Sequence, residues 1–257
     1  MISLNGLITE KKSFDWLADS GFRYGYGCFE TMLFTKEHIP LINHHTHRLT
    51  QSLDALCIDY TPNGLHDRII KLAKHLQLNT PHVCHVFITG GNVLPQPSLK
   101  RTSTEIISFS PMPSPDFSKK CEFKTVQPSD YYRFKSLSYA HHIQALAASH
   151  HWPIYIDTND QVIDSSIFSI GIIQNNTITF AQHAVQLPSV SKKVIIEKLT
   201  TISKPLQKND LLNADTLFGC NAIRGAFPIS LESNSPTTHQ QIDAMNDVLD
   251  FNGRDLT

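Results

Sequence analysis

The sequence predicts a mixed α+β protein built from two domains. Segments with strand and helical hydrophobic patterns alternate along both halves of the chain without a regular repeat. The 257 residues are enough for two hydrophobic cores. Between Ser110 and Pro115, three of six residues are proline, which cannot continue a helix or pair within a central strand. We therefore expect an N-terminal α+β domain over residues 1–112, a proline-rich linker over 113–118 and a C-terminal α/β barrel-like domain over 119–257.

Hydrophobic spacing predicts the elements of the first half. Leu49, Leu53 and Leu56 recur at the spacing of one helix face, which predicts a helix over residues 45–57. The same pattern predicts a second helix over 65–76. Apolar, aromatic and β-branched residues between turn formers predict strands over residues 1–10, 22–42, 80–89 and 105–110.

The second half follows the same alternation. Helical patterns cover residues 139–150 and 190–201, and the tail from Pro236 is also expected to be helical. Strand-like runs are found at residues 122–126, 154–157, 167–173, 176–180 and 215–220.

Composition excludes several classes of partner. The 22 Lys and Arg residues nearly balance the 23 Asp and Glu residues, giving a net charge of −1, so nucleic acid is not expected as the main partner. Apolar runs such as Ile167–Ile173 are far shorter than a membrane-spanning helix, and the N-terminal residues lack the pattern of a signal peptide. The five cysteines are widely spaced with no CxxC pair, so we expect a reduced, cytoplasmic protein.

The fourteen histidines raise the possibility of a metal site. The densest group is His44-His45-Thr46-His47, but neighbouring side chains on one helix or strand point in different directions, and no HExxH motif is present. We therefore expect no metal. The chain also lacks the GxSxG, GxxxxGK[ST] and GxGxxG-helix motifs. Among the lysines, Lys135 is unusual because it has apolar neighbours just before a predicted helix, and a partly buried lysine can form a Schiff base.

An ordered series of segments resembles one enzyme family. The stretch from Asp19 to Thr31 (DSGFRYGYGCFET) resembles the strand signature of the fold-type IV, class IV aminotransferase-like, pyridoxal-phosphate enzymes. The resemblance continues in the same order through His44–Leu49, Lys135–Tyr139, Val162–Asp164, Val190–Ser191 and Cys220–Ile223. It implies the two-domain architecture of D-amino-acid aminotransferases, pyridoxal 5'-phosphate as cofactor and a homodimer.

The resemblance also implies roles for individual residues. Lys135 would hold the cofactor covalently and later move a proton, and Asp164 would keep the cofactor's pyridine nitrogen protonated. Most relatives carry Glu at the position of Asp164, so the side chain here is one methylene shorter. The cofactor's phosphate would be bound by a set of residues from three segments, namely Arg48, Val190, Ser191, Asn221 and Ala222.

The same segments depart from the family pattern in several places. Ser189 replaces a glycine, Lys192 replaces the common arginine, and Ser165–Ser169 replaces a Gly-Ser-x-Ser-Asn segment. An arginine that many of the aminotransferases carry near Gly90 is absent. The differences at Ser189, Lys192 and Ser165–Ser169 leave open a degenerate family member that binds without catalysis.

Within the family, Gly27-Cys28-Phe29 and Cys220–Ile223, followed by Phe227-Pro228-Ile229, are most similar to the 4-amino-4-deoxychorismate lyases. Thr31-Met32-Leu33 follows Phe29-Glu30, where branched-chain aminotransferases show Gly-x-Arg. The expected reaction converts 4-amino-4-deoxychorismate to 4-aminobenzoate and pyruvate, with Glu30 or Thr31 as a further proton donor. The alternative is an aminotransferase acting on a D-amino or branched-chain amino acid.

Overall fold

The computed structural model describes residues 1–257 except 11–13, 37, 93–102, 114–119, 232–238 and 251–257. Contacts within the chain form two compact units. Unit 1 comprises Met1–Pro113 together with Phe134–Tyr139, and unit 2 comprises the other described residues up to residue 250. The predicted linker over 113–118 lies outside the described residues apart from Pro113. Lys135 groups with unit 1, whereas the sequence analysis assigned it to the C-terminal domain; the backbone pairing responsible is described below.

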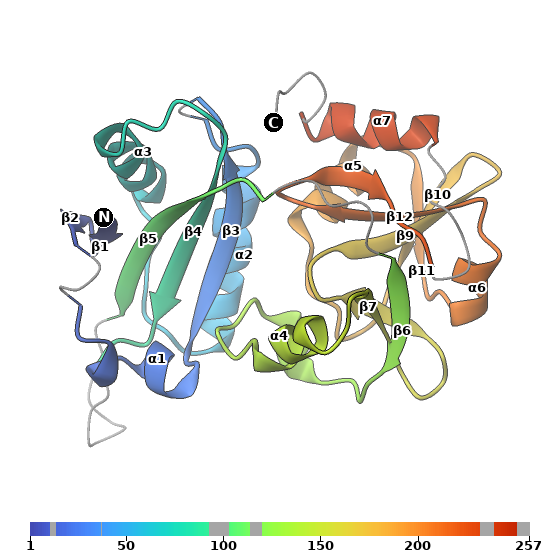
Figure 1. Cartoon of the computed structure of the whole chain (residues 1–257), viewed down its shortest axis with the longest axis horizontal. Helices are drawn as coiled ribbons and strands as arrows, with labels where there is room; N and C mark the ends of the chain where they lie inside the picture. The colour runs from blue at the N-terminus through green and yellow to red at the C-terminus, as the bar shows by residue number, and fades with distance from the viewer. Residues whose placement is uncertain (11–13, 37, 93–102, 114–119, 232–238, 251–257) are drawn as a thin grey trace. The chain divides into compact units, whose positions relative to one another are not determined.

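Unit 1 is built on a five-stranded antiparallel sheet with the strand order β2-β1-β5-β4-β3 (Figure 1). Its strands are β1 (Ile2–Leu4), β2 (Leu7–Thr9), β3 (Gly27–Phe34), β4 (His82–Thr89) and β5 (Thr104–Pro111). β3 and β4 pair along their whole length, from Gly27 opposite Thr89 to Phe34 opposite His82. Successive side chains on each strand therefore point to opposite faces of the sheet.

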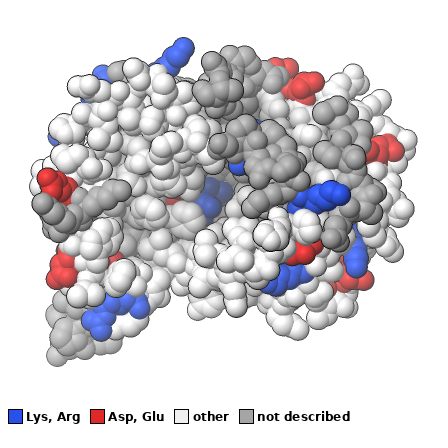
Figure 2. Space-filling model, in the orientation of Figure 1, with Lys and Arg blue, Asp and Glu red and all other residues white. Residues whose placement is uncertain are grey.

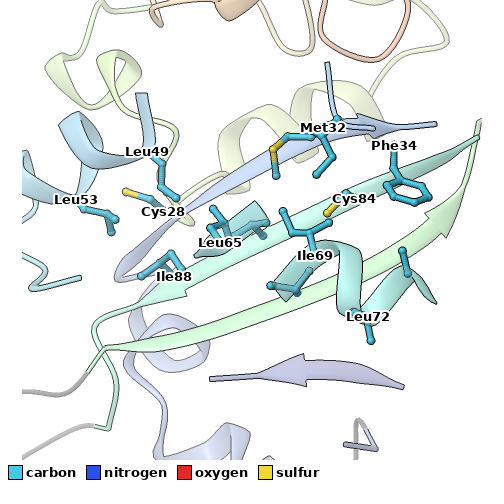
Figure 3. Close-up of a cluster of buried hydrophobic side chains, with 14 of the residues drawn as sticks. Cys28, Met32, Phe34, Leu49, Leu53, Leu65, Ile69, Leu72, Cys84 and Ile88 are labelled. Atoms are coloured by element: carbon cyan, nitrogen blue, oxygen red, sulfur yellow. The ribbon is translucent and has the colours of Figure 1, made fainter. Parts of the chain in front are cut away.

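Helices α2 (Ile42–Ala55) and α3 (Leu65–His75) supply the apolar side chains that cover one face of this sheet (Figure 3). The even-numbered residues of β3 point into this core, where Met32 and Phe34 are fully buried. Leu49 of α2 and Ile69 of α3 pack into the same cluster. Each such buried side chain contributes about 1.5–3 kcal/mol to folding, so this core fixes the orientation of β3 relative to α2.

Unit 2 contains a five-stranded sheet with the order β11-β10-β9-β12-β13 and a three-stranded sheet with the order β6-β7-β8. The strands are β6 (Cys121–Thr125), β7 (Trp152–Ile156), β8 (Val162–Ser165), β9 (Ser169–Gln174), β10 (Thr177–Ala181), β11 (Thr201–Lys204), β12 (Thr216–Asn221) and β13 (Gly225–Pro228). The helices are α4 (Ala140–Ala147), α5 (Val190–Lys198), α6 (Lys208–Leu212) and α7 (Gln240–Val248). The core contains Trp152, Phe168 and Phe227, whose ring centroids lie 5.5–6.2 Å apart.

Most predicted elements are present, with one clear error in the first half. Residues 22–42 were expected to form a strand, but α1 (Ser20–Tyr24) occupies the start of that range. The Asp19 carboxylate accepts hydrogen bonds from the amides of Gly21 and Phe22 and so caps this helix. Gly25 ends it in the left-handed conformation with φ of +64°. Strands β8, β11 and β13 and helix α6 were not predicted, because each has only four or five residues.

Charged side chains are scattered over the face shown in Figure 2 without one large patch of either sign. No helix within the described ranges is both long and apolar enough to cross a membrane. Within the same ranges, no three His, Cys, Asp or Glu side chains gather closely enough to hold a metal ion.

Candidate active site

The segment Phe134–Tyr139 lies against strand β3 of unit 1 and adds a short backbone pairing to it. The Phe29 amide donates to the Lys135 carbonyl, and the Leu137 amide donates to the Gly27 carbonyl, both at 2.9 Å. Cys28 and Ser136 form the bridge between the two segments. Lys135 is therefore fixed by backbone hydrogen bonds at the start of β3, which explains why it belongs to unit 1.

Two glycines make this close approach possible. A Cβ atom on Gly27 would lie 2.5 Å from the Ile88 carbonyl oxygen and 2.6 Å from a Leu137 methyl carbon. A Cβ atom on Gly25 would lie 2.8 Å from the Ser138 hydroxyl. Because real Cβ atoms do not come so close to their neighbours, a side chain at Gly27 would collide with the β4 backbone and with Leu137, and one at Gly25 would crowd Ser138.

Two aromatic rings lie close to the Lys135 ammonium group. Its Nζ atom lies 4.4 Å from the centroid of the Phe29 ring and 5.7 Å from that of Tyr139. The two rings pack edge to face with their centroids 5.3 Å apart. The faces of aromatic rings attract a cation, so both rings favour this position of the lysine.

Thr31 lies on the same face of the sheet as Phe29, since the two residues are two apart on β3. The register places Thr31 opposite His85 and Phe29 opposite Phe87. These four side chains are all half-buried, and the His85 ring stacks on Phe87 with centroids 6.1 Å apart. Burial lowers the pKa of His85, which makes it a neutral group at pH 7. The described strands β3, β4 and β5 contain no Lys or Arg, so the Lys135 ammonium lies beside a face made of aromatic and uncharged side chains.

Glu30 points to the opposite face, toward α2, where it is 1% exposed. The Arg48 Nε atom donates to Oε1 at 2.8 Å and its Nη2 atom donates to Oε2 at 2.6 Å. The His45 Nδ1 atom lies 2.8 Å from Oε2. Arg48 and His45 are three residues apart on α2, so one face of this helix presents both side chains to the carboxylate.

The charges of this cluster follow from its contacts. Burial alone would raise the pKa of Glu30, but the Arg48 guanidinium and the hydrogen bonds from Arg48 and His45 lower it to about 2. Burial also lowers the pKa of His45, and it outweighs the hydrogen bond to Glu30 that acts in the other direction. Glu30 is thus a carboxylate held in an ion pair, which argues against the predicted role as a proton donor.

Unit 2 presents an anion-binding arrangement at the start of α5. The Ser189 hydroxyl caps the helix by accepting from the Lys192 amide at 3.3 Å. Ser191, in the first turn, is 1% exposed, and its hydroxyl has no hydrogen-bond partner among the described residues. The first amides of a helix also lack partners within the helix, and they attract negative charge. Ser189, which replaces the family's glycine, therefore keeps the helix start intact.

Asn221 shapes the loop after β12 with its side chain. Its Oδ1 atom accepts from the amides of Ile223 at 3.0 Å and Arg224 at 2.8 Å, and its Nδ2 atom donates to the Ile167 carbonyl at 3.1 Å. Ala222 lies within the turn that these bonds close. The Asn221 side chain therefore makes hydrogen bonds within the protein through both its oxygen and its amide nitrogen.

Asp164 lies half-buried on β8, opposite Tyr155 of β7. Tyr155 is buried, and its hydroxyl lies 2.6 Å from that of Ser166. Lys192 donates from Nζ to the Ala181 carbonyl at 2.6 Å and to Gln186 Oε1 at 2.8 Å. Burial lowers the pKa of Lys192, and the negative charge of Asp164 acts in the opposite direction. The lysine that replaces the family's arginine thus supplies a positive charge near Asp164 from within unit 2.

A family model for class IV aminotransferases matches residues 27–231, which is about four fifths of the chain. This chain belongs to the class IV aminotransferase family. The predicted family is therefore confirmed, and the class IV match spans nearly all of the segments on which the resemblance was based.

Solved structures similar to this chain share its fold over nearly the whole of its length. The 4-amino-4-deoxychorismate lyase of Pseudomonas aeruginosa is 18% identical with a TM-score of 0.83, and the match covers 98% of this chain and 99% of that one. A hypothetical aminotransferase of Mycobacterium tuberculosis in its PLP-bound form is 16% identical, with a TM-score of 0.84 and 97% of each chain covered. The branched-chain aminotransferase of Thermoproteus uzoniensis is 14% identical, with a TM-score of 0.84 and 98% and 95% covered. The predicted fold-type IV architecture is confirmed.

The residues present fit the family's cofactor. Class IV aminotransferases are pyridoxal-phosphate enzymes, so family membership confirms the predicted cofactor. In unit 1, Lys135 offers an amine on a fixed backbone segment. In unit 2, the buried Ser191 hydroxyl without a partner lies at a helix start suited to a phosphate group.

The predicted site residues fall into two groups. Lys135, Glu30, Thr31 and Arg48 belong to unit 1, while Asp164, Val190, Ser191, Asn221 and Ala222 belong to unit 2. Within unit 1, Glu30 and Thr31 are neighbours in sequence but face opposite sides of the sheet, so only Thr31 shares a face with Phe29 beside the lysine. Sequence reasoning gave no role to His45, although the spacing His45-x-x-Arg48 could have indicated it.

Proposed function

We propose that this chain is a pyridoxal-phosphate-dependent lyase that converts 4-amino-4-deoxychorismate to 4-aminobenzoate and pyruvate. The observation that carries this proposal is the Lys135 ammonium beside the face formed by Phe29, Thr31, His85 and Phe87. Aromatic side chains on that face suit a ring that becomes aromatic during the reaction. The absence of Arg and Lys from the described strands β3–β5 favours the lyase over an aminotransferase that holds an amino-acid carboxylate with an arginine on these strands.

The proposed chemistry needs few groups from the protein. When bound, the cofactor supplies an electron sink for the charge that develops at ring carbon C4 of the substrate. The Lys135 amine removes the C4 proton, the bond between C3 and the enolpyruvyl oxygen breaks, and the ring becomes aromatic. One proton returns to the leaving enolpyruvate, which becomes pyruvate, so no water is consumed. We assign the delivery of this proton to Lys135 or to the Thr31 hydroxyl.

The family resemblance supplies the cofactor-binding part of the proposal. Arg48, the first turn of α5 with Val190 and Ser191, and the loop of Asn221 and Ala222 would hold the phosphate. Asp164 would stand at the pyridine nitrogen. The family resemblance also supports a homodimer as the active form and the cytoplasm as its location, and sedimentation of the purified protein tests the first of these.

The test is an absorbance titration of purified full-length protein with pyridoxal 5'-phosphate, followed by addition of 4-amino-4-deoxychorismate. We expect a visible band that requires Lys135, with release of 4-aminobenzoate and pyruvate in equal amounts. Lys135→Ala should lower turnover by about 10³-fold or more, because it removes both the attachment point and the proton carrier. Lys71→Ala, on the exposed side of α3, is the matched control and should behave as the wild type. A band without these products, but with conversion of an added amino acid to its keto acid, would make the chain an aminotransferase. The absence of any band would remove both enzymes.

A further inference from the structure

The Glu30–Arg48–His45 cluster holds the arginine through its Nε and Nη2 atoms. It is named here the open cluster, because the buried His45 Nε2 atom has no partner among the described residues. Nε and Nη2 form a two-point contact with the two carboxylate oxygens of Glu30. Such a fork fixes the plane of the guanidinium as well as its position. The Glu30 and Arg48 side chains are 1% and 10% exposed, so water competes little with these bonds.

The third member of the open cluster has a defined tautomer. Because Glu30 is ionised, its oxygens can only accept, and the His45 Nδ1 atom must therefore carry the proton of the 2.8 Å hydrogen bond. The Nε2 atom is left as an acceptor, and it is buried without a partner among the described residues. The groups that act on the His45 ring are Glu30, Arg48 and Lys135, of which Glu30 is the anion. His45 thus steadies one oxygen of the carboxylate that holds Arg48.

We propose that Glu30 and His45 are positioning residues that hold Arg48 ready for a phosphate monoester dianion before that anion binds. The inference rests on the proposed function, in which Arg48 binds the cofactor's phosphate. An arginine loses conformational freedom when it binds an anion, and a carboxylate that already fixes its plane removes much of that cost. The same carboxylate keeps the buried guanidinium compensated while no anion is bound.

A second arginine–carboxylate pair in unit 1 provides the matched control. Arg68 donates from Nε to Glu105 Oε1 at 2.8 Å and from Nη2 to Oε2 at 2.7 Å, which repeats the fork of the open cluster. Here the Arg68 Nη1 atom also donates to the Asn63 carbonyl at 2.6 Å, and Tyr60 donates to Glu105. We name this group the closed cluster, since Tyr60 and the Asn63 carbonyl add hydrogen bonds to its fork.

The experiment measures the affinity of the full-length apoprotein for pyridoxal 5'-phosphate and for pyridoxal, which lacks the phosphate. Glu30→Gln should weaken binding of the phosphorylated compound by about 10- to 100-fold, as loss of an orienting partner does at other ligand sites. It should change pyridoxal affinity by less than about 3-fold, because only the phosphate meets Arg48. Glu105→Gln should lower the thermal midpoint of the apoprotein and leave both affinities unchanged. The proposal would be overturned if Glu30→Gln lost affinity equally for both compounds, kept the wild-type affinities, or bound pyridoxal 5'-phosphate more tightly.

Two substitutions of His45 distinguish the roles of its two ring nitrogens. Both leave the buried ion pair between Glu30 and Arg48 in place. Asn places an amide donor near the position of Nδ1, whereas Gln places its amide near Nε2. We expect His45→Asn to bind pyridoxal 5'-phosphate within a few fold of the wild type and His45→Gln to bind it about 10-fold more weakly. Wild-type affinity in both variants, or equal loss in both, would show that the Nδ1 donor does not act on Arg48.

The result of these cofactor-binding measurements can be distinguished from the result of the lyase assay. A wild-type protein that binds pyridoxal 5'-phosphate but yields no 4-aminobenzoate would refute the proposed reaction and leave the positioning test intact. A wild-type protein that binds no pyridoxal 5'-phosphate would refute both.

Discussion

Unit 1 contains two arginine–carboxylate forks, the open and the closed cluster, with the same two-point geometry and different surroundings. In both, Nε and Nη2 of the arginine meet the two oxygens of a glutamate at 2.6–2.8 Å. Both carboxylates are nearly inaccessible, with side-chain exposures of 1% for Glu30 and 3% for Glu105. The forks differ in the third partner and in the exposure of the arginine, which is 10% for Arg48 and 25% for Arg68.

The two clusters use the same arginine–glutamate ion pair for different purposes. The closed cluster joins helix α3 to β5 and to the chain around Tyr60 and Asn63, and these contacts stabilise the fold. The open cluster leaves the buried His45 Nε2 atom without a partner in the described structure, and it includes Arg48, the residue that the family resemblance links to phosphate. A buried polar atom without a partner costs free energy, so this atom does not add to the stability of the open cluster.

The largest expected difference comes from removing each arginine. Arg48→Ala leaves the Glu30 carboxylate buried without its cation and should lower the free energy of unfolding by about 3–5 kcal/mol. Arg68→Ala should cost about 1–3 kcal/mol, because Tyr60 still donates to Glu105 and water can reach the vacated, more exposed site. Urea unfolding of the apoproteins at pH 7 measures both values. Equal costs would mean that the two forks do not differ in the way their surroundings suggest.

Lowering the pH weakens the open cluster by a predictable amount. The pKa of Glu30 is about 2 in the folded protein, against an ordinary value of 4.5. The unfolded chain therefore binds a proton first as the pH falls, and the stability that Glu30 contributes is present above pH 4.5 and lost toward pH 2. This difference corresponds to about 3 kcal/mol. Unfolding of the wild type and of Glu30→Gln at pH 7 and pH 2 should show their stabilities converging by that amount. A constant difference between them across this range would contradict the ionised state of Glu30.

The open cluster also shows how far the sequence could predict the site. The ordered motifs led to the correct family, fold and cofactor, and the leucine spacing located α2 and α3 within a few residues. The side that Glu30 faces could not be predicted, because strand alternation shows that Glu30 and Thr31 point in opposite directions but not which one points to the core. The position of the helices on the sheet decides this, through packing between residues far apart in the chain.

The assignment of Lys135 to a domain failed for a similar reason. Its position after the proline-rich segment indicated the C-terminal domain, but the hydrogen bonds to Gly27 and Phe29 join residues more than 100 positions apart. The glycine pattern around Gly25 and Gly27 was noticed in the sequence and interpreted as a family motif. Its physical cause, the close approach of β4 and of the lysine segment, becomes visible only when Ile88 and Ser138 are placed beside these glycines.

The smallest effect tests whether the closed cluster is purely structural. Tyr60→Phe removes the hydroxyl that donates to Glu105 and that accepts from the Arg68 Nη2 atom at 3.0 Å. Since Arg68 still compensates the carboxylate, we expect a loss of about 1 kcal/mol in the free energy of unfolding, measured with urea at pH 7. Affinity for pyridoxal 5'-phosphate, measured on the same preparations, should stay unchanged, whereas His45→Gln in the open cluster should weaken it. If Tyr60→Phe weakened cofactor binding as well, both forks would serve the cofactor, and the distinction between an open and a closed cluster would fail.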